Sequence, residues 1–307
     1  MTLHPAFGGF DQVLPLSGFS GAAIALVKPT GQAQFVRKAA TAPASDAALR
    51  KQSARQDWLK TALDGVARVP EILGEGEIDG LYYFDMAFVP SRDANAFLST
   101  ASFAELGGFA ERVEELIRGT AGRTLPTGQG KPPTIALIRA KLAEIAERTG
   151  GQCADLLAPL ADAAARIERY ATNDAATVTH GDLTFENILV NARGELWLID
   201  PIDSPVDHYW VDWSKLFQDC EGRWHVHRGK PISLGVTRWL RNRWYEAAVA
   251  QDPDYAQRHY LMLGLTYARI LPYTVSQEDR AFVSERVLAY GRAALDPSLG
   301  LSLGVTP

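Results

Sequence analysis

The chain has 307 residues, of which 47% are hydrophobic and 22% charged, which is typical of a soluble globular protein large enough for two lobes. Its net charge of -5 gives no support for general nucleic-acid binding, which needs a surplus of Lys and Arg. Two distant cysteines, no signal-like N-terminus and no uncharged apolar run of about 18 residues predict a cytoplasmic protein without a membrane segment or a disulfide framework.

The first part of the chain alternates short apolar runs with turn signals. The turn "PTGQ" separates two runs rich in strand formers, and Asp79 with Gly80 separates two more. Between these pairs, apolar residues recur at helical spacing after Ser45, which is expected to be the N-cap. The expected elements are strands over 22–28 and 33–39, a helix over 46–63, and strands over 71–78 and 81–89.

From Pro90 onward the periodicity is helical. Helices are expected over 103–119 and 134–150, each ending at Gly, then from 154 and again over about 211–294. This order predicts an α+β protein with a small antiparallel-sheet lobe carrying one helix, residues 1–89, and a larger, mainly helical lobe, residues 90–307.

The stretch "VTHGDLTFENILVNARGELWLID", residues 178–200, places polar groups beside buried apolar runs. Asp182 and Asn187 are separated by four residues, and Asp200 follows two short strands joined by the turn "NARG". Phosphoryl transfer needs a carboxylate that takes the proton of the acceptor hydroxyl, and oxygen ligands that hold Mg²⁺ against phosphates. This spacing suits both tasks. The alternative is that these residues only cap turns.

"HGDLTFENIL" followed by "LIDP" resembles the catalytic and metal-binding segments of the aminoglycoside phosphotransferase and choline kinase superfamily, which has the two-lobed protein-kinase-like fold. The resemblance implies that Asp182 is the catalytic base and that Asn187 and Asp200 hold Mg²⁺. It further implies that His180 organises the loop, and that Asp212 in "VDWSKL" accepts hydrogen bonds from the loop backbone.

The resemblance also implies an ATP site in the first lobe. Gly18, Ser20 and Gly21 precede a strand, where backbone N–H groups can cradle phosphates, although a glycine turn before a strand is common. Lys38 is the expected phosphate-binding lysine, with its neighbour Arg37 as the alternative. The backbone groups of Asp85 to Phe88 are expected at the adenine edge. The side chains of Met86 and Phe88 are expected to give apolar contact.

The sequence departs from the family at the partner of Lys38. The resemblance implies a glutamate on the following helix, but the helix offers Gln56 as first choice and Gln52 as second. A carboxamide can position an ammonium group but cannot neutralise it. This departure keeps open a nucleotide-binding pseudokinase or scaffold as the alternative to an enzyme.

Two features favour a small acceptor over a protein. Gly181 stands where protein kinases have the Arg of their H-R-D motif, and eleven residues between Asp200 and Asp212 leave little room for an activation segment. Residues 222–245 contain no Asp or Glu but several basic and aromatic residues. This favours a sugar or phosphate-bearing acceptor over a polycationic aminoglycoside, although an amphipathic helix with a basic face is the alternative.

Three residues are candidate acceptor contacts: Asp203, Arg223 and Trp224. A further similarity, of "HGDLT", "LIDPIDS" and "LFQDCEGRW", is to bacterial phosphotransferase-like proteins associated with surface glycans. The sequence thus predicts an ATP- and Mg²⁺-dependent kinase that phosphorylates a hydroxyl group of a small molecule, with a sugar or glycan precursor favoured and an aminoglycoside or choline-type acceptor as the alternative.

Overall fold

A computed structural model describes residues 4–16, 21–167 and 174–296. The chain forms two compact units, one made of residues 1–93 and 187–202, the other of residues 94–186 and 203–307. The first unit therefore differs from the expected residues 1–89 by taking in a later segment. That segment joins the first unit because its strands pair with a strand that follows residue 89.

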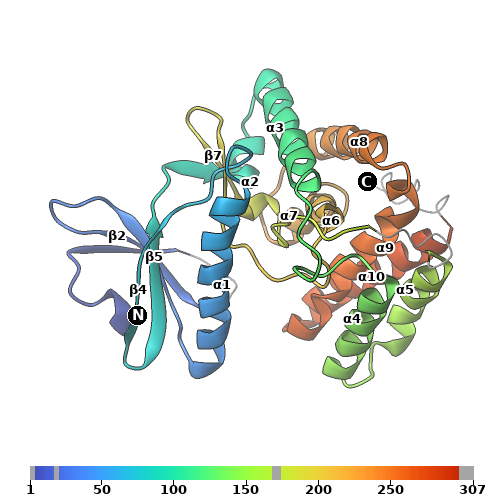
Figure 1. The fold of residues 1–307 in the computed structure, drawn as a ribbon, viewed down its shortest axis with the longest axis horizontal. Coiled ribbons are helices and arrows are strands. Elements are labelled where there is room, and N and C mark those ends of the chain that lie inside the picture. Colours follow the sequence, from blue (N-terminus) through green and yellow to red (C-terminus); the bar gives the residue numbers. More distant parts are fainter. Residues whose placement is uncertain (1–3, 17–20, 168–173, 297–307) are drawn as a thin grey trace. The chain divides into compact units, whose positions relative to one another are not determined.

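The first unit contains an antiparallel sheet in the order β1-β2-β3-β5-β4 and one long helix, α1, as the sequence predicted (Figure 1). The hairpin turn between β4 and β5 is formed by Asp79 and Gly80, both at positive φ, which Gly and Asp tolerate best. The elements are η1 (Pro5–Phe7), β1 (Gln12–Leu16), β2 (Ala23–Lys28), β3 (Phe35–Ala39), α1 (Pro43–Ala62), β4 (Ile72–Ile78) and β5 (Leu81–Ala87).

Helix α1 begins at Pro43, three residues earlier than expected, and Ser45 is not its N-cap. Ser45 lies at the third helical position, where its hydroxyl accepts hydrogen bonds from the N–H groups of Thr41 and Ala42. The buried face of the helix packs against one side of the sheet through Leu49 and the β5 residues of the same apolar cluster. Helical periodicity therefore predicted the helix, whereas the start was displaced because Pro43 is compatible with the first helical turn.

A second, three-stranded sheet belongs to the same unit. Its strands are β6 (Ser91–Asp93), β7 (Ile188–Asn191) and β8 (Leu196–Leu198), in that order and antiparallel. The β7–β8 pair is the hairpin around "NARG" that the sequence predicted. Its register pairs Ile188 with Leu198, which places the residues before β7 and after β8 at one end of the hairpin.

The second unit is helical, and α6 lies in its core. Every residue of α6 is buried, and the helix packs against α3, α8 and α9. Among the described residues, no helix combines the length and the apolar composition needed to cross a bilayer. The elements are α2 (Ala94–Leu98), α3 (Phe103–Ala121), α4 (Ile135–Arg148), α5 (Ala154–Ile167), η3 (Phe185–Asn187, which ends at the unit boundary), α6 (Tyr209–Cys220), α7 (Trp224–His227), α8 (Leu234–Gln251), α9 (Tyr255–Ala268), η4 (Leu271–Tyr273) and α10 (Gln277–Leu295).

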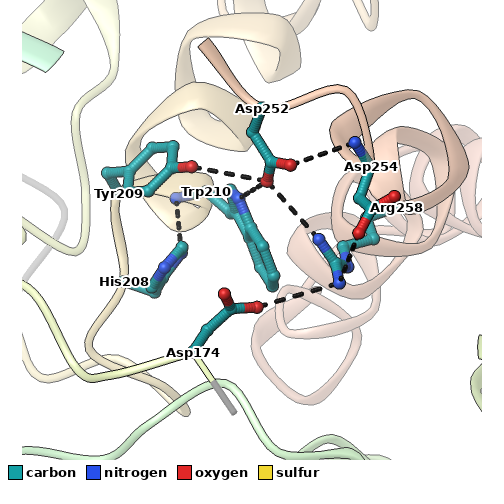
Figure 2. Close-up of polar contacts among 7 residues, drawn as sticks. All are labelled: Asp174, His208, Tyr209, Trp210, Asp252, Asp254 and Arg258. Atoms are coloured by element: carbon teal, nitrogen blue, oxygen red, sulfur yellow. Dashed lines mark hydrogen bonds and ion pairs between the residues drawn. The ribbon is translucent and has the colours of Figure 1, made fainter. Parts of the chain in front are cut away.

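A polar cluster anchors the start of α6 (Figure 2). The carboxylate of Asp252, at the end of α8, accepts hydrogen bonds from the Trp210 indole at 2.9 Å and from the Tyr209 hydroxyl at 3.4 Å. Arg258 of α9, only 6% exposed, lies 3.4 Å from the same carboxylate and covers the Trp210 ring. Two more carboxylates, those of Asp174 and Asp254, lie 3.7 Å from this guanidinium. The cluster therefore fixes the first turn of α6 to both α8 and α9.

His208, the N-cap residue of α6, is buried beside this cluster. Its Nδ1 accepts a hydrogen bond from the Trp210 N–H, and its ring contacts those of Tyr209 and Trp210. Burial, reinforced by the positive charge of Arg258, lowers the pKa of His208 from 6.5 to about 3. The ring is therefore neutral in the folded protein, as its acceptor role requires.

Acidification from pH 7 to pH 5 is expected to destabilise the protein through His208. The folded-state pKa lies below the unfolded value, so the unfolded chain binds more protons between about pH 6.5 and pH 3, and the stabilisation present above pH 6.5 is lost as the pH falls. His208→Gln should lose less unfolding free energy over this interval than the wild type, by about 2 kcal/mol. Urea unfolding at both pH values measures the difference.

Tyr209→Phe is the matched control, because it alters the same cluster without removing a group that titrates in this range. This control should keep the pH dependence of the wild type. An equal loss of stability in His208→Gln and wild type would show that His208 does not carry the effect.

Candidate active site

Lys38 lies on β3 in the first unit, and its side chain is only 2% exposed. Its ammonium group forms an ion pair with Asp200 and lies 3.5 Å from Gln52 Oε1. The structure thus brings together a lysine and a carboxylate that are 162 positions apart in the chain. Asp200 supplies the negative charge that the carboxamide of Gln52 cannot.

The expectation that Gln56 is the partner of Lys38 is wrong. Gln56 is fully buried, and its amide donates to Pro70 O at 2.9 Å and to Met86 Sδ at 3.5 Å. It lies one helical turn beyond Gln52, about 6 Å further along the axis, where it packs between α1 and the β4–β5 side of the sheet. The second choice, Gln52, is the residue within reach of Lys38.

Arg37 faces the opposite side of β3 from Lys38, because successive strand residues alternate. Its guanidinium binds Asp85 through two bonds of 2.7 and 2.8 Å and donates to Ala6 O at 2.8 Å. A buried cation with this complete set of partners is structural. The choice of Lys38 over Arg37 is therefore supported by the position of each side chain.

The expected adenine contacts need correction. Asp85 and Met86 lie within β5, where each is paired with residues of both β3 and β4, so their backbone groups belong to the sheet. The Met86 side chain is 4% exposed and lies in the apolar core, and the Asp85 carboxylate is held by Arg37. Of the three expected residues, only Phe88 lies beyond the end of the strand, and it is partly buried against the same core.

Of the three residues expected at the phosphates, Gly18 and Ser20 lie outside the described residues. Gly21 is exposed directly before β2 and has φ of +71°, a conformation that a residue with a side chain would adopt only with strain. Its carbonyl accepts a hydrogen bond from the Thr41 hydroxyl at 2.6 Å. The turn is therefore attached to the segment that leads into α1.

Asn187 and Asp200 lie at the same end of the β7–β8 hairpin in the first unit. The backbone N–H of Ile199 donates to Asn187 O at 3.1 Å, which joins the residues before β7 and after β8. Asp200 has φ of +60°, an uncommon value for a residue other than glycine, and outliers of this kind often mark functional sites. An amide and a carboxylate oxygen donor fit Mg²⁺, which commonly takes one or two protein ligands and completes its shell with phosphates and water.

In the second unit, the loop from His180 to Phe185 is held by α6. Asp212 accepts hydrogen bonds from the backbone N–H groups of His180 and Gly181, both at 2.9 Å. His180 is 1% exposed, and its Nδ1 accepts a hydrogen bond from the Asp182 N–H at 3.3 Å. These are the contacts that the resemblance implied for a loop-organising histidine and a buried aspartate.

Two further residues of α6 contact the loop and were missed from the sequence. The Lys215 ammonium lies 2.9 Å from Asp182 Oδ1, and Asp219 accepts a hydrogen bond from the Phe185 N–H at 2.7 Å. Together with Asp212 they are spaced i, i+3 and i+7, which places all three on one face of the helix. Three charged residues at this spacing within the otherwise apolar "YWVDWSKLFQDC" are a signal that the sequence does carry.

The charge of Asp182 is controlled by its surroundings. Burial acts to raise the pKa of this carboxyl, but Lys215, Arg269 and His180 lower it by more, so the net pKa lies below the ordinary value. The side chain remains 27% exposed. Asp182 is therefore an ionised carboxylate at neutral pH with access to a ligand, as a proton acceptor requires.

For Asp219, in contrast, the effect of burial is the one that prevails. It raises the pKa of this carboxyl to about 7, and the nearby carboxylates of Glu186 and Asp182 add to the increase, while the hydrogen bond from Phe185 opposes it. Burial likewise raises the pKa of Asp212. Both residues therefore serve best as hydrogen-bond acceptors for the loop, whereas Asp182 is the strongly acidic member of the group.

The basic and aromatic stretch from residue 222 to 245, which contains six Lys and Arg residues, is partly neutralised by other segments. Three of its cations pair with carboxylates from other segments: Arg241 with Glu221 at 3.1 Å, Arg243 with Glu114 at 2.6 Å, and Lys230 with Glu186 at 3.1 Å. The carboxylates that neutralise these cations lie outside residues 222–245, so the composition of the stretch alone does not reveal them.

The candidate acceptor residues are placed differently from one another. Trp224 is partly buried and packs its ring against Tyr267 and Phe282, and its contact with the acceptor stays a prediction. Arg223 is half-buried, at positive φ, at the start of α7. Asp203 is exposed.

Removal of the Asp212 carboxylate is expected to destabilise the second unit. Asp212→Ala leaves two buried backbone N–H groups without an acceptor, and each costs about 1 to 3 kcal/mol. Asp212→Asn keeps one acceptor oxygen and should lose roughly half as much. Urea unfolding measures both. Equal stability of Asp212→Ala and wild type would contradict this role.

Comparisons with known proteins agree with this geometry. A sequence profile of the phosphotransferase enzyme family matches residues 12–261. A comparison with curated proteins gives no match. Three solved structures share the fold: a mutant of aminoglycoside 2'-phosphotransferase IIIa (16% identity, 95% of both chains, TM-score 0.63), a candidate fructosamine-3-kinase from Thermobifida fusca (16%, 92% and 93%, 0.63) and an aminoglycoside phosphotransferase from Streptomyces rimosus (19%, 92% and 95%, 0.53).

The profile covers most of the chain, and the fold is the two-lobed kinase-like one that the sequence predicted. The chain belongs to the phosphotransferase enzyme family, and its fold is shared by aminoglycoside phosphotransferases.

Proposed function

We propose that this enzyme transfers the γ-phosphoryl group of ATP to a hydroxyl group of a neutral or anionic sugar, such as a glycan precursor, with the help of Mg²⁺. The observation that carries the proposal is the ionised Asp182 carboxylate beside two cations, Lys215 and Arg269. The carboxylate provides the proton acceptor, and the cations give the surroundings of the base a positive balance.

Nucleotide use is supported on the first unit by Lys38 and Gly21, the described members of the expected phosphate site. It is further supported by the neighbours, because the 2'-phosphotransferase structure is a GDP complex and the Streptomyces rimosus enzyme was also solved with ADP and streptomycin. We assign Lys38 to the nucleotide phosphates and Asn187 with Asp200 to Mg²⁺. When bound, this ion would neutralise phosphate charge.

The pair between Lys38 and Asp200 bears on the alternative of a non-catalytic scaffold. That alternative rested on the missing helix glutamate, which leaves Lys38 with a carboxamide partner. In the structure, Asp200 neutralises Lys38 and Gln52 lies within reach of the same ammonium. The site therefore has the charges that the reaction needs. In this assignment, the carboxylate of Asp200 is both the partner of Lys38 and a ligand of the metal.

Asp182 is assigned to accept the proton of the acceptor hydroxyl. Its Oδ1 lies 2.9 Å from the Lys215 ammonium, which keeps the carboxylate ionised. General-base catalysis of this kind typically contributes about 10²- to 10⁴-fold to the rate. His180 and Asp212 keep the backbone of the loop in place while the proton moves.

The acceptor is assigned from the charges around Asp182. Arg269, the residue that follows α9, acts on Asp182 electrostatically, and no carboxylate lies within ion-pair distance of its guanidinium among residues 174–296 and the other described segments. A polycationic aminoglycoside would meet like charges from Lys215 and Arg269, which costs binding energy. A neutral sugar avoids this cost, and an acidic or phosphorylated sugar is attracted by the same positive charges.

The direct test is ADP release by the purified enzyme with ATP, Mg²⁺ and a panel of acceptors. We expect turnover with neutral or acidic sugars and sugar phosphates, and at least tenfold lower kcat/KM with aminoglycosides, since about 1.4 kcal/mol of unfavourable interaction suffices for that ratio. Asp182→Asn should lower kcat about 10²- to 10⁴-fold with every acceptor and leave ATP affinity unchanged in calorimetry.

Three results would count against this assignment. Full activity in Asp182→Asn would exclude Asp182 as the base. Preference for an aminoglycoside over every sugar would overturn the acceptor class but retain the phosphotransferase. ATP binding without turnover across the panel would favour the scaffold.

A further inference from the structure

We propose that Lys215 is a positioning residue that holds the Asp182 carboxylate in a single orientation through the contact between its ammonium group and Oδ1. The inference rests on the proposed role of Asp182 as the base. It assigns a function to a residue of α6 that lies outside the motifs by which the site was recognised.

The position of Lys215 is unusual for a lysine. Its side chain is 8% exposed, in a helix that is buried along its whole length. A buried ammonium group is costly unless it is paired and hydrogen-bonded. Here the Nζ atom lies 2.9 Å from Asp182 Oδ1 and donates to Gln218 Oε1 at 3.0 Å. Two partners on different segments therefore define where the ammonium lies.

Two contacts fix the position of the Lys215 ammonium group beside Asp182. Gln218 is one turn further along α6, so it holds the lysine head from its own helix, while Asp182 lies on the loop. The backbone of that loop is fixed on both sides of Asp182, by Asp212 at Gly181 and by Asp219 at Phe185. With the backbone fixed in this way, rotation of the Asp182 side chain is the remaining freedom, and the contact with Lys215 restricts it.

Several other charged groups act on Asp182, and Lys215 must be distinguished from them. His180 comes from the loop itself and Arg269 from the end of α9, and both also favour the ionised form. Asp219, on the same face of α6 as Lys215, opposes it as a like charge. Among these groups, the contribution of Lys215 is the largest favourable one, and its ammonium group lies at ion-pair distance from Asp182.

A purely structural ion pair is the competing explanation. In that case, removal of the lysine would still raise the pKa of Asp182, because a neighbouring cation is lost, but kcat at the pH optimum would stay near the wild-type value. A positioning role predicts in addition that kcat falls at the pH optimum, where Asp182 is ionised, while the KM for ATP does not change.

The experiment compares the wild type with Lys215→Met, which keeps the length of the side chain and removes the charge. We expect the acid limb of the kcat/KM profile to move to higher pH, and kcat at the pH optimum to fall about 10- to 100-fold, as misplacement of a catalytic group typically does. The KM for ATP should change less than twofold. Lys215→Arg keeps the charge, so its acid limb should stay with the wild type even if its larger head lowers kcat.

A second readout does not depend on turnover. The carboxyl of Asp182 can be titrated by ¹³C NMR in protein labelled at Asp, with its signal assigned by loss in Asp182→Asn. The titration should move to higher pH in Lys215→Met. If Met at this position prevents folding, Lys215→Gln serves the same comparison. Because no acceptor is needed, failure of this test is distinct from failure of the proposed function.

Lys60→Met is the matched control. Lys60 forms an exposed pair with Glu71 at 3.1 Å in the first unit, so its removal should leave both the acid limb and the Asp182 titration unchanged. An unchanged Asp182 titration in Lys215→Met and Lys215→Gln would overturn the proposal. So would a kcat at the pH optimum that stays near the wild-type value.

Discussion

Buried backbone N–H groups need acceptors, and the loop that carries Asp182 obtains several of them from carboxylates instead of from a helix or sheet ladder. The N–H groups of His180, Gly181 and Phe185 all donate to aspartates of α6. Such groups cost about 1 to 3 kcal/mol each when they are left unpaired. The conformation of the loop is therefore determined by the position of one helix.

That helix is itself held at its start by a separate cluster. Asp252 accepts hydrogen bonds from Tyr209 and Trp210, and Arg258 covers the Trp210 ring (Figure 2). The first turn of α6 is therefore attached to neighbouring helices, and the residues that contact the loop follow later in the same helix. Support thus passes from Arg258 through α6 to the backbone beside Asp182. The buried charges on α6 are costly in themselves, and the hydrogen bonds that they accept from the loop offset part of this cost.

Much of the fold could be predicted from the sequence because its signals are local. Helical and alternating periodicity predicted α1 and the β2–β3 and β7–β8 hairpins, and a motif made Asp182, Asn187 and Asp200 candidate site residues. Interactions between distant segments could not be predicted in this way. Gln52 was ranked below Gln56 because both share the helix face, and only the sheet packing separates them.

The charge balance around the site shows the same limit. Residues 222–245 look cationic in the sequence, yet Glu114, Glu186 and Glu221 neutralise three of their cations from elsewhere. Lys215 and Asp219 were overlooked for the opposite reason. They are charged residues inside an apolar helix, where spacing of i, i+3 and i+7 on one face was available in the sequence but was not used.

The central claim is that α6 fixes the loop beside Asp182 through buried hydrogen bonds. Native-state hydrogen exchange of the backbone amides of His180, Gly181 and Phe185, followed by NMR, tests it most directly. The account predicts that all three amides exchange as slowly as those of α6, because they are released only when the second unit opens. Exchange at the rate of an unstructured peptide, while α6 stays protected, would contradict it.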